Sequence, residues 1–159
     1  MNASYEWLKA FVAFDATPTQ LRDLITAHTA TVDELVPVRQ DLAPIVVARV
    51  IDASPHPDSD HLWFTKVDDG SGELLEVVCG APNVTAGKLY PFARVGVTIP
   101  TGMKMERRKI RGIVSNGMLC SAKELGLGEN HDGILELNVD VAPGTKFLCA
   151  MAVGETRLF

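Results

Sequence analysis

Five basic side chains lie within eight consecutive positions of a chain that is acidic overall, with 15 Lys and Arg against 20 Asp and Glu. The cluster consists of Lys104, Arg107, Arg108, Lys109 and Arg111. Each can neutralise a phosphate and release its counterions, and five such contacts predict a log–log salt slope of roughly −3 to −5. A solvated β-hairpin that only keeps the protein in solution would have the same composition. Composition alone does not separate these two interpretations.

Aromatic rings often accompany such basic clusters, because unstacked bases lie flat on them. Trp63 and Phe64 are adjacent in a run typical of a strand, so their side chains must point to opposite faces. We predict that Trp63 is on the exposed face, where it would stack on a base. A Trp63 half-buried against the N-terminal helices is the competing interpretation.

The histidines and cysteines do not predict a metal or catalytic centre. Five of these residues could be assembled into a metal site on paper, yet no pair has the close spacing typical of zinc ligands. They are His56, His61, His131, Cys79 and Cys120. The sequence also lacks a nucleophile elbow, a Walker loop, a dinucleotide fingerprint and a deaminase signature. We therefore expect loop histidines, core thiols and no catalysis.

The composition is typical of a soluble domain with its own core. The chain has 159 residues, of which 47% are apolar, enough for one domain plus an attachment. No apolar run approaches the roughly 20 residues needed to cross a bilayer, and the amino end does not resemble a secretory signal. The three cysteines are far apart and odd in number, which favours reduced thiols and a cytoplasmic location.

The first thirty residues predict two short helices. Ser4 can cap a helix that carries Trp7, Leu8 and Phe11 on one side. Residues 17–20, Thr-Pro-Thr-Gln, form a capping box with proline at the first helical position.

From about Asp41 the pattern changes to short β-rich runs separated by turn residues such as Asp-Gly-Ser-Gly at 69–72. The predicted strands are Ile45 to Ala53, Leu62 to Val67, Leu74 to Cys79, Leu89 to Val95, Ile110 to Val114 and Ile134 to Leu137. Five or six strands in about a hundred residues favour a small barrel over a sandwich. Ser121 to Glu124 is a second capping box that Gly126 soon ends, which predicts one short helix inserted late in the barrel.

Several motifs resemble one family in their order along the chain. They are Ser4 to Lys9, Pro55 to Leu62, Val78 to Val84, Lys109 to Gly112, Ser115 to Ser121, Glu124 to Gly128 and His131 to Leu135. Together they resemble the N-terminal region of bacterial phenylalanyl-tRNA synthetase β subunits. The segments 55–62 and 117–121 are shared with other tRNA-binding barrels, whereas the Cys-Gly-Ala-Pro-Asn loop and the two leading helices resemble the β subunit specifically.

The resemblance implies a mainly β, α+β fold: a five-stranded OB-fold barrel with a short inserted helix, preceded by two N-terminal helices of a discontinuous domain. The expected boundaries are 1–40 for that helical part, 41–150 for the barrel and 151–159 for the return to the first domain. It further implies a tRNA-binding module without catalysis of its own. The α subunit and the remainder of the β subunit would be its partners, and ATP and magnesium would act elsewhere in the parent enzyme.

Two other functions stay open. The region could be a structural module that anchors subunits and contacts RNA only incidentally, which the acidic net charge favours. It could also be a free-standing tRNA-binding, chaperone-like dimer, although the two leading helices are unexpected there.

On the tRNA-binding interpretation, polar loop residues would supplement the basic cluster. Asn83, Ser115 and Asn116 would meet sugars or base edges, and Ser121 would open a helix whose N-terminus favours anions. The chain departs from the family pattern at two positions. His61 stands where relatives usually carry Lys, which makes any phosphate contact there dependent on pH, and Ser59 stands where Ala is usual.

Overall fold

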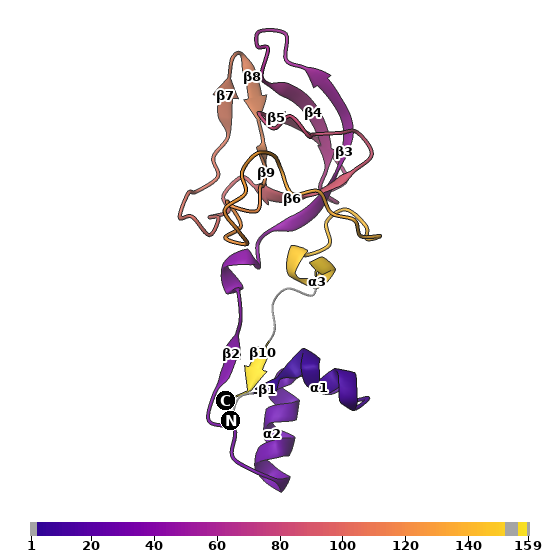
Figure 1. The fold of residues 1–159 in the computed structure, drawn as a ribbon, viewed down its shortest axis with the longest axis vertical. Helices are drawn as coiled ribbons and strands as arrows, with labels where there is room; N and C mark the ends of the chain where they lie inside the picture. The colour runs from indigo at the N-terminus through magenta and orange to yellow at the C-terminus, as the bar shows by residue number, and fades with distance from the viewer. Residues whose placement is uncertain (1–2, 152–155, 159) are drawn as a thin grey trace. The chain divides into compact units, whose positions relative to one another are not determined.

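The computed structural model describes residues 3–151 and 156–158, which fall into two compact units (Figure 1). One unit comprises the chain up to Gln40 together with the C-terminal strand, and the other comprises Asp41–Met151. No helix in the described part of the chain is long and apolar enough to cross a membrane.

The first unit contains two helices and a small antiparallel sheet. The sheet has the order β1-β10-β2, from β1 (Ala3–Ser4), β10 (Thr156–Leu158) and β2 (Leu35–Pro37). Helix α1 (Tyr5–Phe11) begins as predicted, because the Ser4 side chain accepts a hydrogen bond from the backbone of Trp7 at 3.2 Å. Helix α2 (Pro18–His28) has the predicted capping box, in which Thr17 and Gln20 each bond the other's backbone N–H.

The second unit is a five-stranded antiparallel sheet that curls into a nearly closed barrel, so the predicted fold class is confirmed. Its strands, in the order β5-β4-β3-β6-β9, are β3 (Val46–Pro55), β4 (Trp63–Asp68), β5 (Leu74–Cys79), β6 (Leu89–Arg94) and β9 (Gly117–Leu119). A hairpin, β7 (Arg108–Ile110) and β8 (Ile113–Ser115), lies in the connection between β6 and β9. A 3-10 turn, η1 (Gln40–Leu42), precedes the barrel, and a short helix, α3 (Phe147–Met151), follows it.

Strand β3 is long enough to serve both halves of the barrel. Its first residues, Val46 to Arg49, pair with β6, and the stretch from Arg49 to Pro55 pairs with β4. The register shifts between Val50 and Asp52, so Ile51 has no partner in β4 and is exposed. Such a bulge bends a strand and increases its twist, which lets one strand follow the curvature of the barrel.

The core is built from alternate residues of these strands, mostly valine with a few larger side chains. Val50, Val67, Val77, Tyr90 and Phe92 are completely buried. The Tyr90 hydroxyl is not left without partners, because it donates to Asn83 O at 3.0 Å and accepts from Thr85 N at 3.1 Å. The one phenol in this core is therefore buried with its hydroxyl bonded.

Residues 115–117 close the barrel between β5 and β6. The backbone N of Val78 in β5 donates to the Ser115 hydroxyl at 3.1 Å, and the backbone N of Asn116 donates to Glu76 O at 2.9 Å. On the other side, Gly117 pairs with Arg94 of β6. Strand β5 is thus linked to the two residues before β9 by single hydrogen bonds rather than by a ladder.

Three sequence predictions in this region were wrong in detail. Ile110 to Val114 is not one strand, because the chain reverses at Arg111 and Gly112, both with positive φ. Residues 134–137 form a single bridge, from Leu137 to Leu89, instead of a strand. The predicted helix after Ser121 is one hydrogen-bonded turn: its capping box forms, but Gly126 with φ of 61° ends it at once.

We expect Gly117→Ala to destabilise the barrel by about 2–4 kcal/mol. Gly117 has φ of 149°, and an added Cβ would overlap the Phe92 ring and lie 2.8 Å from Ala93 O. Gly128→Ala is the matched control, since nothing lies within 4 Å of a Cβ there. Chemical denaturation of both variants measures the difference. Equal stability of the two would show that β9 does not need this close approach.

Candidate nucleic-acid interface

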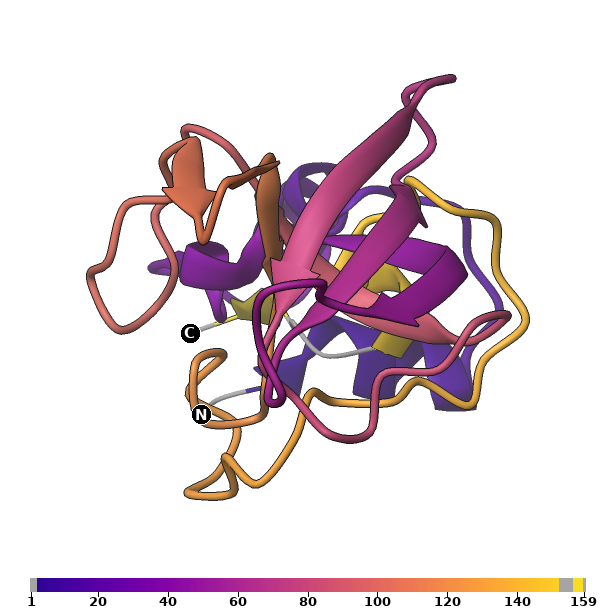
Figure 2. The ribbon, with the colours of Figure 1, turned by 90° about the horizontal axis from the view of Figure 1, so that it is seen from above.

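The five basic side chains of the predicted cluster all lie on the connection between β6 and β9, and all five residues are exposed. Seen from above, this connection forms one side of the barrel (Figure 2). Among the described residues, no ion pair involves any of the five. A group of exposed cations without carboxylate partners can meet a phosphate without first breaking an ion pair.

The hairpin β7–β8 determines where the basic residues 108, 109 and 111 lie relative to one another. Its pairs are Arg108 with Ser115, Lys109 with Val114 and Ile110 with Ile113. The reversal at Arg111 and Gly112 uses φ of 44° and 88°, the combination of two positive angles that type I′ hairpin turns require. Arg111 therefore lies at the tip of the hairpin and not on the strand face of Lys109.

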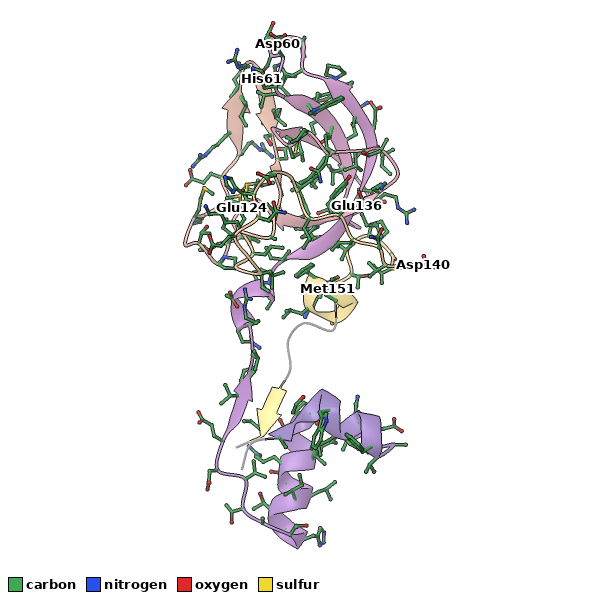
Figure 3. The ribbon with its side chains drawn as sticks, in the orientation of Figure 1. Asp60, His61, Glu124, Glu136, Asp140 and Met151 are labelled. Carbon is green, nitrogen blue, oxygen red and sulfur yellow. The ribbon has the colours of Figure 1, made fainter. Side chains whose placement is uncertain are left out.

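The tip of the hairpin contacts the loop between β3 and β4. Arg111 Nη1 donates to Asp58 O at 3.0 Å. The loop is organised around His56, a buried residue whose Nδ1 accepts from the backbone N of Asp58 at 3.1 Å. Asp60 and His61 are exposed at the tip of this loop (Figure 3). Two segments more than fifty residues apart in the sequence thus form one surface.

Trp63 is on the opposite face from the one we predicted. Trp63, Thr65 and Val67 alternate toward the barrel interior; Thr65 and Val67 are fully buried, and Trp63 packs against the core. Phe64 therefore lies on the outer face with the exposed Lys66. The sequence could not decide between the two rings, because the cross-strand register determines which one points inward.

Asn83, Ser115 and Ser121 have internal partners. Asn83 Nδ2 donates to Ile134 O at 2.8 Å, and its Oδ1 accepts from Ile134 N at 2.9 Å, so the side chain ties two loops together. The buried Ser115 hydroxyl donates to Gly117 O at 3.0 Å in addition to accepting from β5. The buried Ser121 bonds Glu124.

Asn116 is partly buried and also has an internal partner, because its Nδ2 donates to Glu76 O at 3.2 Å. The structure therefore brings the five basic residues and Asn116 to one connection. It places Asn83 and Ser121 elsewhere, in segments that stabilise the barrel.

Sequence reasoning missed an ion pair beside this connection. Arg94 Nε donates to Asp69 Oδ2 at 2.6 Å, and Arg94 Nη2 donates to Asp69 O at 2.7 Å. Asp69 is 1% exposed and also accepts from the backbone of Ser71 at 3.0 Å. Burial raises the pKa of this carboxyl, but the hydrogen bonds from Ser71 and Arg94 outweigh it, so the pKa of Asp69 lies below its usual range.

No group of three or more His, Cys, Asp or Glu side chains in the described part of the chain is arranged to hold a metal ion. The two buried thiols are also poor ligands and nucleophiles, because both of these need the thiolate. Burial raises the pKa of Cys79, and burial together with the nearby Glu124 raises that of Cys120 to about 12. Neither buried thiol is therefore a candidate metal ligand or nucleophile.

Comparison with known proteins gives one family and a consistent set of relatives. A family model described as a putative tRNA binding domain matches residues 45–146. The phenylalanine–tRNA ligase β subunit of Bordetella parapertussis is 45% identical over 156 residues, which cover 98% of this chain and 19% of that protein. Those of Nitratidesulfovibrio vulgaris and Bacteroides fragilis are 47% and 41% identical, over 93% and 91% of this chain and 18% of each relative. The chain thus spans about a fifth of the length of these relatives.

We expect Asp69→Asn to lower the free energy of unfolding at pH 7 by about 1–3 kcal/mol. The pKa of Asp69 is lower in the folded chain than its ordinary value of 3.8, so its ionic contribution is complete above that value. It is lost as the pH falls below 3.8 and through the lower pKa of the folded state. Urea denaturation at pH 7 and pH 3 should show the difference between the two proteins shrinking in acid. A difference of the same size at both values would contradict this account.

Proposed function

Because the chain belongs to the family of putative tRNA-binding domains, we propose that its barrel binds tRNA as a non-catalytic part of a phenylalanine–tRNA ligase β subunit. The observation that carries the proposal is the position of the basic cluster. It lies on the connection between the fourth and fifth barrel strands, β6 and β9, and contacts the loop between the first and second, β3 and β4, through Arg111 and Asp58. OB-folds bind oligonucleotides with these two connections and with the face of their second and third strands.

Contacts between basic side chains and RNA phosphates supply most of the affinity in this proposal. Lys104, Arg107, Arg108 and Lys109 are exposed and have no ion-pair partner among the described residues. The net charge of −5 opposes the approach of a polyanion, so attraction must come from short-range contact with this connection. Binding should therefore fall steeply with salt.

Base contacts in this proposal come from the outer face of β4 and β5. Phe64 pairs across the strands with Val78, which lines a pocket of about 160 Å³ together with Met103, Met118 and Arg108. A flat ring on the outer face of a strand is the kind of surface on which a single-stranded base stacks. Neither stacking nor phosphate contacts depend strongly on base identity, so the barrel would recognise RNA shape and backbone.

We propose a catalytic activity only for a longer protein that contains this barrel. Joined to the remainder of the β subunit and to an α subunit, the barrel would hold tRNA while a catalytic centre elsewhere uses ATP and magnesium in the cytoplasm. No residue of the barrel would bind ATP or take part in the chemical step.

We expect Arg107, Arg108 and Lys109, all changed to Ala, to reduce the log–log salt slope for tRNA binding by about 2–3. As a control, changing Arg22, Lys88 and Lys146 to Ala removes the same charge from other parts of the chain and should leave the salt slope nearly unchanged. Fluorescence anisotropy of labelled tRNA, from about 50 to about 300 mM salt, measures the salt slopes of both variants. If the unaltered chain did not bind tRNA at low salt, a structural role would be the better account.

Phe64→Leu should weaken binding of tRNA by roughly 1–3 kcal/mol, the usual contribution of one stacked base, without changing the salt slope. Leucine keeps an apolar side chain on β4 but removes the flat ring. Leu74→Ala is the control, because Leu74 is a 52% exposed residue at the far end of the neighbouring strand β5. Undiminished binding by Phe64→Leu would exclude this ring as a stacking platform.

A further inference from the structure

A pocket of about 380 Å³ lies beside the ion pair of Arg94 and Asp69, at the start of the basic connection. Its lining combines two guanidinium groups, two small polar side chains and two aliphatic ones. They are Arg94, Arg107, Ser71, Asn116, Leu75 and Val95, in addition to Asp69. These residues come from four separate segments of the barrel, so only the folded chain assembles them.

Arg94 is fixed in place but not fully used. Its Nε and Nη2 bond Asp69, which is itself buried and held by Ser71. A guanidinium has five N–H donors, so three remain after these two bonds. The Arg94 side chain is 42% exposed and lines the pocket, so it has donors left for a ligand there.

Arg107 supplies a second cation to the same pocket. It is exposed and takes part in no ion pair among the described residues. Asp69 compensates one of the two positive charges, which leaves the pocket with a net charge of one. An ion pair that only tied the turn after β4 to the end of β6 would need neither the second arginine nor the accessible donors.

We propose that this pocket binds one phosphate of the RNA backbone, held by Arg94 and Arg107 together. Guanidinium groups bind phosphate oxygens through paired N–H donors, and Arg94 is oriented for this before the ligand arrives. The partly buried Leu75 and the exposed Val95 form an apolar wall against which the adjoining ribose or base lies. The inference rests on the proposed function and extends the RNA surface from the hairpin to the end of β6.

The test is a double-mutant cycle on the salt dependence of tRNA binding. Arg94→Gln and Arg107→Gln should each lower the log–log slope by about 0.7–0.9 and weaken binding about five- to tenfold at 0.1 M salt. If both arginines hold one phosphate, the double variant should lose about one unit of slope in total. The matched pair Arg107→Gln with Lys109→Gln should lose about two, because those side chains would hold different phosphates.

Arg94→Gln also removes the bond to Asp69, so its stability must be measured in parallel. Arg107→Gln leaves that bond intact and keeps the test valid if the Arg94 variant is poorly folded. A second readout is the ¹⁵N–¹H signal of Arg94 Nε, which should shift on addition of hexauridylate. Binding of tRNA by the unaltered chain, with a salt slope that Arg107→Gln lowers and a folded Arg94→Gln leaves unchanged, would overturn the pocket alone. No binding by the unaltered chain would overturn the proposed function as well.

Discussion

Closure of the barrel at residues 115–117 is the constraint on which the rest of the second unit depends. Ser115 and Asn116 bond β5, and Gly117 allows β9 to approach the Phe92 ring on β6. The basic connection leaves β6 just after Arg94 and rejoins the barrel at this closure. Because both of its ends are anchored in the hydrogen-bonded sheet, the charges between them are presented by a hairpin with a defined direction.

Electrostatics in this barrel is local. Acidic residues outnumber basic ones in the whole chain, yet the five exposed cations of the connection form no ion pair among the described residues. Arg94, at the end of β6, pairs with the buried Asp69. The neighbouring loop carries Asp58 and Asp60, and it meets the hairpin through a backbone carbonyl and not through a carboxylate. The basic side chains of the connection are therefore available to an external anion.

Local sequence signals predicted the features that local physics determines. The caps of α1 and α2 and the exposure of the five basic residues follow from neighbouring side chains. Features that depend on distant residues were missed. The inward position of Trp63 follows from register, the reversal at Arg111 uses a residue without the usual glycine or asparagine signal, and the bonds of Asn83 to Ile134 join loops 51 residues apart. The pairing of Arg94 with Asp69 could not be predicted either, since nothing in the sequence connects the end of β6 with the turn after β4.

The anchoring of the basic connection also bears on how this barrel can change during evolution. Both ends of this connection are held by the barrel strands, so most residues between the ends contribute little to closing the barrel. The entropic cost of closing a loop grows slowly, by about 0.6 kcal/mol for each doubling of length. Insertions and substitutions at the exposed positions between Arg94 and Ser115, away from the buried Ile99 and Met105, are therefore inexpensive for folding. Descendants of one barrel can acquire different ligands while the strands that support them stay the same.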